Sequence, residues 1–75
     1  MLIFSKDRKT IADCKALTVS KNLGKKDEKF AIVGSVSSEA FDTKVLAFYP
    51  DEKTALSELE RLFEAFEGGA RAYRL

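Results

Sequence analysis

The chain has no histidine, only one cysteine and only one proline, and its apolar runs are short. Histidine is the side chain that most often transfers protons near neutral pH, so the usual acid–base catalyst is absent. One cysteine cannot form an internal disulfide, and without a histidine beside it Cys14 cannot complete a structural zinc site. No apolar run approaches the roughly 20 residues that a membrane-spanning helix needs. These absences disfavour acid–base enzymes, zinc proteins and transmembrane proteins, and we expect no cofactor and no metal.

The size of the chain predicts a need for additional stabilisation. Its 75 residues form a single domain, residues 1–75, with no room for a second. A domain this small buries only about 60% of the surface that its unfolded chain exposes, and such domains usually gain stability from a disulfide, a metal or a partner subunit. Because the first two are excluded, we expect a homo-oligomer.

The charge balance and the cysteine usage predict a cytoplasmic protein. Thirteen basic and twelve acidic residues leave a net charge of +1, which predicts weak general attraction to nucleic acid and to anionic membranes. The first residues lack the basic segment and the cleavage site of a signal peptide. An unpaired cysteine is typical of a reducing compartment. We therefore expect no membrane partner.

A helix is predicted over residues 51–69. Asp51 is the expected N-cap, because its carboxylate can accept hydrogen bonds from the first free amides of a helix. Gly68 and Gly69 are expected to end the helix, one of them in the left-handed conformation that glycine adopts without strain. Apolar residues recur between these ends at spacings of three and four and predict one stripe: Leu56, Leu59, Leu62, Phe63 and Phe66.

Strands are predicted before and after the helix, where apolar residues alternate with polar ones or cluster between turn signals. The predicted strands are residues 2–4, 10–14, 16–20, 30–36, 43–49 and 71–75. The predicted fold class is α+β, with one helix on an antiparallel sheet of about five strands that is flat or curled. The order of elements is β-β-β-β-β-α-β or β-β-β-β-α-β.

Two of the predicted strands, residues 30–36 and 43–49, are apolar on both faces. Such strands are normally covered on two sides, whereas one helix covers only one face of a sheet. Either a second copy of the chain covers the other face, or the sheet curls around its own side chains. We expect the first arrangement, because apolar patches of more than a few hundred Å² are rare on monomers.

Few residues are candidates for catalysis. The acidic pairs are Asp51–Glu52 and Glu58–Glu60. Both pairs are expected in solvent-facing positions, where carboxyl pKa values stay near their ordinary range. Cys14 has Lys15 as its neighbour, but adjacent residues of a strand point to opposite faces, so Cys14 is expected to be a packed small hydrophobe. We predict no catalytic residue and no enzyme activity.

Two basic clusters are candidate anion-binding sites. The long charged turn before the fourth strand carries Lys25 and Lys26 after a glycine, a partial match to a phosphate-binding loop that lacks the second glycine and the following helix. In the last strand, Tyr73 has arginines on both sides and could stack on a base while the arginines hold phosphate. The plain alternatives are a solvated turn and an edge strand with a packed tyrosine. The candidate ligand-binding residues are Lys25, Lys26, Arg71, Tyr73 and Arg74.

Both ends of the chain follow a recognisable pattern. An apolar strand leads into Ser-Lys-Asp at residues 5–7 and then into Thr-Ile-Ala-Asp at residues 10–13. Near the other end, an aromatic strand leads into a helix with an early alanine, Ala55, followed by leucines, glycines and a short aromatic strand. In this pattern the chain resembles small uncharacterised proteins of Gram-positive bacteria and their phages. The resemblance implies a setting in which small proteins act by binding, and it transfers no site residue.

Three functions fit these observations. The first is a non-enzymatic interaction protein, homo-oligomeric and encoded by a phage or mobile element, that binds a host macromolecule. The second is an oligomer that sequesters a nucleotide-like anion between its subunits. The third is a weak nucleic-acid-binding protein, which the near-neutral charge disfavours. The expected partners are therefore the chain itself and a foreign protein, with a small anionic ligand as the alternative.

Overall fold

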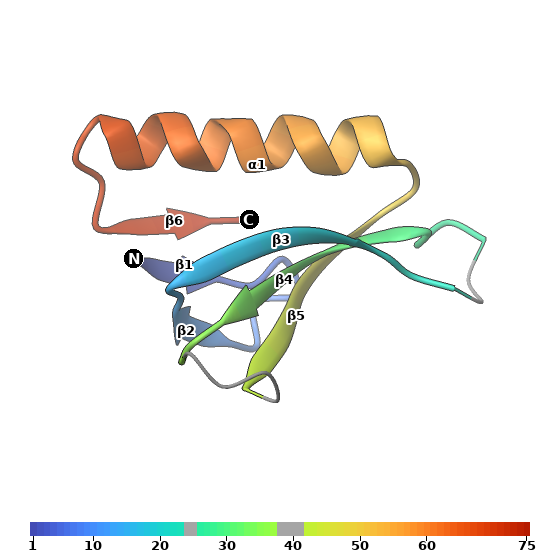
Figure 1. The fold of residues 1–75 in the computed structure, drawn as a ribbon, viewed down its shortest axis with the longest axis horizontal. Coiled ribbons are helices and arrows are strands. Elements are labelled where there is room, and N and C mark those ends of the chain that lie inside the picture. The colour runs from blue at the N-terminus through green and yellow to red at the C-terminus, as the bar shows by residue number, and fades with distance from the viewer. Residues whose placement is uncertain (24–25, 38–41) are drawn as a thin grey trace.

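The structure is a computed structural model that describes residues 1–23, 26–37 and 42–75. Within these ranges it is an α+β fold in which five strands are followed by one helix and a sixth strand (Figure 1). The elements are β1 Leu2–Phe4, β2 Ile11–Asp13, β3 Ala16–Lys21, β4 Phe30–Ser35, β5 Thr43–Tyr49, α1 Glu52–Glu67 and β6 Ala72–Arg74. The α+β class and the single helix are confirmed, and the order is the longer of the two predicted orders.

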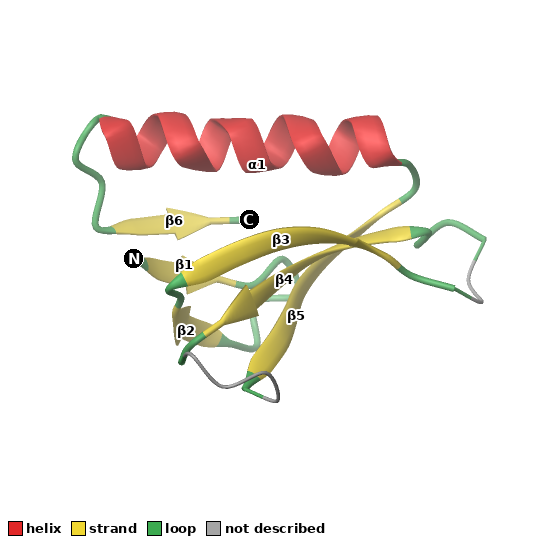
Figure 2. Cartoon of the chain, viewed as in Figure 1, coloured by secondary structure: helices red, strands yellow, loops and turns green. Residues whose placement is uncertain are grey.

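The strands form two three-stranded sheets, in the orders β2-β1-β6 and β3-β4-β5 (Figure 2). The pairs β1–β2, β3–β4 and β4–β5 are antiparallel, whereas β6 runs parallel to β1, with Leu2 opposite Ala72. The prediction of one antiparallel sheet of about five strands was wrong in the number of sheets, in the number of strands and in the direction of β6. The physical reason is the helix: its 16 residues extend about 24 Å and return the chain to the side where β1 begins.

Backbone hydrogen bonds join the two sheets. The Lys6 amide donates to the Leu46 carbonyl over 2.8 Å, which links the end of β1 to β5. The pairing of β4 with β5 contains an irregularity at Leu46, because Ile32 lies opposite Ala47 while Val33 lies opposite Val45. An extra residue of this kind bends a strand and redirects its side chain. Leu46 is consequently buried with the first sheet rather than exposed with Val45.

The core lies between the two sheets and beneath the helix. The largest fully buried side chains are Ile3, Ile32 and Leu46. One buried cluster combines residues of both sheets with one residue of α1: Ile3, Ala12, Cys14, Leu46 and Leu62. The other connects the second sheet to the start of α1: Ile32, Ala47, Tyr49 and Ala55. Each cluster needs the helix, so α1 stabilises the pairing of the two sheets.

The ends of α1 are set by the predicted signals. The Asp51 carboxylate accepts a hydrogen bond of 2.7 Å from the Thr54 amide, which confirms the N-cap. At the other end Gly69 has a φ of 91°, and the amides of Gly69 and Ala70 donate to the carbonyls of Phe66 and Ala65. This is the two-bond arrangement that a left-handed glycine allows at a helix C-terminus. None of the helices in the described ranges is long and apolar enough to cross a membrane.

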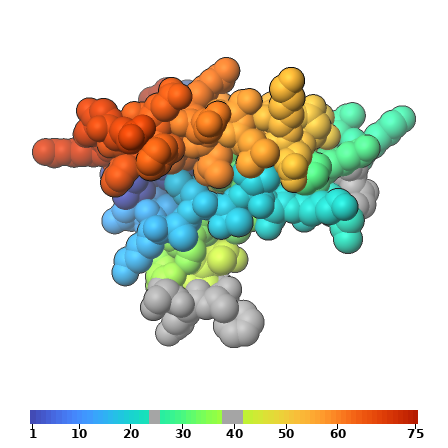
Figure 3. Space-filling model, turned by 45° about the horizontal axis from the view of Figure 1, so that its top comes forward, coloured from blue at the N-terminus to red at the C-terminus, as the bar shows by residue number. Residues whose placement is uncertain are grey.

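The position of α1 leaves part of the second sheet uncovered. The helix lies along one side of the molecule, next to β6 and β3, and its residues rest directly on β3 (Figures 1 and 3). The central strand β4 is mostly buried, as predicted. In the edge strand β5, Val45 is 51% exposed and Phe48 is 38% exposed. The described residues of a single chain therefore do not cover the outer face of this strand.

Candidate functional site

The most prominent exposed apolar surface of α1 consists of Leu56, Phe63 and Phe66, called here the α1 flank. These side chains are 46%, 58% and 58% exposed, although the sequence stripe predicted them on the buried face. Of the α1 residues, only Ala55 and Leu62 are buried. The apolar arc of α1 is wider than the surface beneath it, so the residues at its margin remain in contact with solvent.

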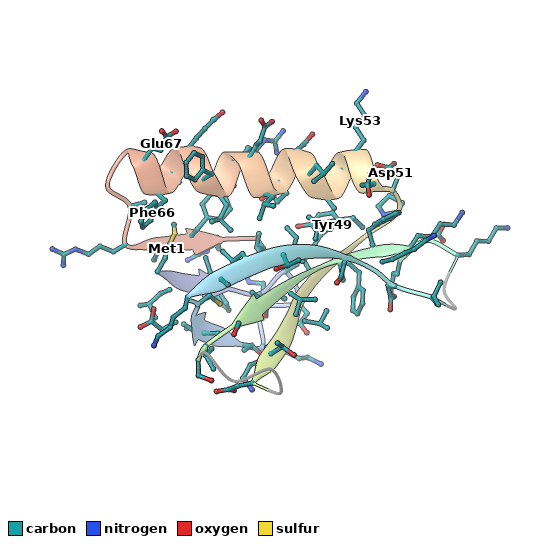
Figure 4. The ribbon with its side chains drawn as sticks, viewed as in Figure 1. Met1, Tyr49, Asp51, Lys53, Phe66 and Glu67 are labelled. Atoms are coloured by element: carbon teal, nitrogen blue, oxygen red, sulfur yellow. The ribbon has the colours of Figure 1, made fainter. Side chains whose placement is uncertain are left out.

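A groove lies between this flank and the N-terminal part of the chain. Its volume is about 430 Å³. The lining residues are Met1, Cys14, Lys15, Ala16, Leu17, Leu59, Leu62, Phe63 and Phe66. Phe66 and Met1 lie close together at the C-terminal end of α1 (Figure 4). The charged groups of this lining are Lys15 and the Met1 ammonium, which pairs with Asp13 over 3.0 Å. The other lining residues are apolar, so this α1 groove is suited to apolar side chains.

Cys14 lines the α1 groove but is not an activated nucleophile. It is buried, and its Sγ lies 3.7 Å from the carbonyl oxygen of Ala12, to which it donates. Burial raises the pKa of the Cys14 thiol, with the charge of Asp13 raising it further and the N-terminal ammonium opposing both. The thiol is therefore protonated near neutral pH, and a protonated thiol is a poor nucleophile. The predicted packing role of Cys14 agrees with this environment.

Carboxylates border the α1 flank on its solvent side. Glu60 lies four residues after Leu56 and three before Phe63, and Glu67 lies four residues after Phe63, so these side chains are neighbours on the helix surface. Glu52 lies four residues before Leu56. All three glutamates are exposed, and within the described part of the chain no ion pair engages them. Figure 4 shows Glu67 on the side of α1 away from the sheets and Phe66 on the opposite side.

Glu58 and Tyr73 form a polar contact between α1 and β6. The Tyr73 hydroxyl donates to Glu58 Oε1 over 3.1 Å, and the Arg61 guanidinium pairs with Glu58 Oε2 over 3.3 Å. The Glu58 side chain is 17% exposed, so its predicted solvent-facing position was wrong. Burial, followed by the hydrogen bond to Glu58, raises the pKa of Tyr73. The Tyr73 ring also packs against the core, so the ring and the hydroxyl already have partners.

The other predicted ligand-binding residues do not form one site. Arg71 is exposed, and the Arg74 guanidinium lies 5.5 Å from the centre of the Phe4 ring. Lys26 is exposed in the turn between β3 and β4, and Lys25 lies outside the described residues. Figure 1 places this turn at one end of the molecule and β6 towards the other. The sequence analysis did not predict the α1 groove. The feature that indicated it was the number of large apolar residues in α1, five, which is more than the sheets beneath the helix can cover.

Tyr49 holds a buried hydroxyl beneath α1. The residue is 4% exposed, and its hydroxyl has no hydrogen-bond partner in the part of the chain that the structure describes. Burial raises the pKa of Tyr49 to about 12, with the charge of Glu58 as the next cause. The ammonium of Lys6 lies 4.6 Å from the centre of the Tyr49 ring. A neutral phenol at this position is a core residue and offers no proton near neutral pH.

A second hollow of about 390 Å³ lies beside β5. Its lining mixes charges of both signs with apolar residues: Lys6, Asp7, Asp27, Glu28, Val45, Leu46, Ala47, Phe48 and Pro50. Within the described ranges, no group of three histidine, cysteine or acidic residues is placed to hold a metal ion. Comparisons with family models, with curated proteins and with solved structures found no significant match.

Proposed function

We propose that this chain is a non-enzymatic interaction protein that acts by binding a macromolecule at the α1 groove. The observation that carries the proposal is the exposure of Phe63 and Phe66 beside an apolar hollow. Large exposed apolar side chains that adjoin a concave surface are typical of interaction sites. The environment of Cys14 supports a binding role over a catalytic one, because burial keeps its thiol protonated.

We also propose that the chain self-associates through the outer face of its second sheet. Val45 and Phe48 expose apolar surface there, on the side of β5 where a second copy can pack. Homo-oligomerisation of this kind stabilises small domains that lack disulfides and metals. The proposed setting is the cytoplasm of a Gram-positive bacterium, with a phage or mobile element as the source, and this part relies on the sequence resemblance and the charge pattern alone.

The binding proposal can be tested by selecting peptides from an unbiased display library on the immobilised protein. The selection is repeated on the variant Phe63→Ser/Phe66→Ser, with Phe48→Ser as a matched control in which an exposed phenylalanine outside the groove is replaced. We expect peptides that bind the wild type and the control but not the double variant. Enrichment that is equal on all three proteins, or absent from all three, would contradict the proposed function.

Native mass spectrometry tests the self-association proposal separately. We expect a discrete oligomer of the wild type that dissociates in the variant Val45→Lys/Phe48→Lys and persists in Phe63→Ser/Phe66→Ser. A monomer at all concentrations would contradict self-association and leave the binding proposal standing.

A further inference from the structure

We infer that the α1 groove takes a basic amphipathic helix of a partner protein, and not a second copy of this chain, a nucleic acid or an anionic membrane. The inference rests on the proposed function and adds the chemistry of the partner. It is carried by two observations: the apolar lining of the groove and the unpaired glutamates along its border.

The apolar lining matches a helix. On α1 the groove is lined by Leu59, Leu62, Phe63 and Phe66, which follow one another at spacings of three, one and three. Residues at such spacings form a ridge along the helix, and ridges of this kind pack against the grooves of another helix. A partner helix with apolar residues at i, i+3, i+4 and i+7 presents the complementary surface.

The negative charge of α1 favours a partner helix with positive charge. Residues Glu52–Glu67 contain five glutamates against one lysine and one arginine, a net charge of −3, whereas the whole chain carries +1. Of these glutamates, Glu58 is already engaged by Tyr73 and Arg61. Glu60 and Glu67 adjoin Phe63 and remain free to meet positive charges at the rim of the groove.

The same charges argue against the other occupants. Two copies that met through their α1 flanks would bring a net charge of −3 towards a net charge of −3. Nucleic acid and anionic lipid headgroups would likewise meet carboxylates, whose repulsion opposes binding. Lysine or arginine beside the apolar positions of a partner helix removes this repulsion and adds attraction at the rim.

The test uses two synthetic helical peptides of 18 residues with identical apolar positions, one with lysines and one with glutamates at the flanking positions. Binding to the intact protein is measured by fluorescence anisotropy at low and at high salt. We expect the lysine peptide to bind at least about tenfold more tightly, since several rim pairs each contribute a few-fold. Raising the salt concentration should reduce this difference, because exposed charges are screened.

Charge-reversal variants locate the effect. The variant Glu60→Lys/Glu67→Lys should bind the glutamate peptide more tightly than the lysine peptide. Asp27→Lys is the control: it reverses the charge of an exposed residue in the turn between β3 and β4, outside the α1 groove, and should keep the wild-type order. Phe63→Ser/Phe66→Ser should lose both peptides.

Other results would overturn the inference. If library-selected peptides require Phe63 and Phe66 but carry acidic or uncharged flanks, the assigned partner is wrong while the proposed function stands. If native mass spectrometry finds a dimer that Phe63→Ser/Phe66→Ser dissociates, the occupant of the groove is a second copy. If neither synthetic peptide binds and no selected peptide depends on the two phenylalanines, the inference and the proposed function both fail.

Discussion

Gly34 and Cys14 lie so close that a single methyl group does not fit between them. A Cβ at Gly34 would stand 2.6 Å from Cys14 Sγ and 2.8 Å from Leu46 Cδ1. Gly34 belongs to β4 in the second sheet, and Cys14 follows β2 in the first. The absence of a side chain at Gly34 is therefore what allows the two sheets to approach one another.

The variant Gly34→Ala should be destabilised by about 1–3 kcal/mol, the usual cost of overpacking a core. Urea denaturation followed by circular dichroism measures this change. The double variant Cys14→Ala/Gly34→Ala should recover part of the loss relative to the sum of the two single variants, because Sγ is the closest obstacle. Strict additivity of the two changes would contradict the contact.

The N-cap of α1 should make stability depend on pH in the acid range. The hydrogen bonds from Thr54 hold the pKa of Asp51 below its ordinary value. A carboxyl whose folded pKa is depressed contributes stability above its unfolded pKa, near 3.9, and loses it as pH falls through the folded value. Asp51→Asn keeps a capping side chain without a titrating group, so its unfolding midpoint should vary less with pH below about pH 4 than that of the wild type. Identical acid profiles would count against this assignment.

The hydrogen bond between Tyr73 and Glu58 should couple β6 to α1. A double-mutant cycle of Tyr73→Phe and Glu58→Leu, measured by urea denaturation, should give a coupling energy of about 1 kcal/mol. Arg61→Gln serves as the control, because Arg61 is exposed and pairs with the other oxygen of Glu58. Removing the Arg61 guanidinium should change the free energy of unfolding by less than about 0.5 kcal/mol. A coupling energy near zero would mean that the contact does not hold β6 in place.

Neighbouring residues of α1 should differ sharply in their contribution to stability. Leu62 is 5% exposed and Phe63 is 58% exposed. Leu62→Ala should cost about 2–5 kcal/mol, whereas Phe63→Ser should change stability by about 1 kcal/mol or less. The comparison is made at protein concentrations below any self-association. If Phe63→Ser costs as much as Leu62→Ala, the Phe63 ring is buried in solution and the α1 flank is not a free surface.

The two glycines after α1 should respond in opposite ways to substitution by alanine. Gly69 has a φ of 91°, where an L-residue is strained, so Gly69→Ala should cost about 1–2 kcal/mol. Gly68 has a φ of −78° and only ordinary contacts around an added Cβ, so Gly68→Ala should be neutral or slightly stabilising. Thermal unfolding of the two variants measures the difference. If the two variants shifted the unfolding temperature equally, Gly69 would not be the residue that adopts the left-handed conformation.

The helix could be predicted from the sequence because its signals are local. Asp51 and Gly69 act on the few residues next to them, and each adopts the expected conformation. The parallel pairing of β6 could not be predicted, because the neighbour of a three-residue strand depends on where a distant helix ends in space. The irregularity at Leu46 could not be predicted either, because it depends on how β5 pairs with β4 while the Leu46 side chain packs against the first sheet.

The site was less predictable than the fold. Periodicity identified Phe63 and Phe66 as apolar positions but could not state how much of the arc the sheets would cover. Glu58 offered a usable signal: it lies three residues after Ala55 and four before Leu62, both of which are buried. A carboxylate between two core positions needs a polar partner, and Tyr73 supplies it.

The pairing of β1 with β6 also fixes when the first sheet can be completed. Leu2 lies opposite Ala72, so about 70 residues must be synthesised after β1 before it has both of its neighbours. Contacts between residues so distant in sequence form slowly, because a long loop must close before any of them is made. While β6 is still inside the ribosome, the nascent chain exposes one edge of β1. We therefore expect the docking of β6 to be the last step of folding.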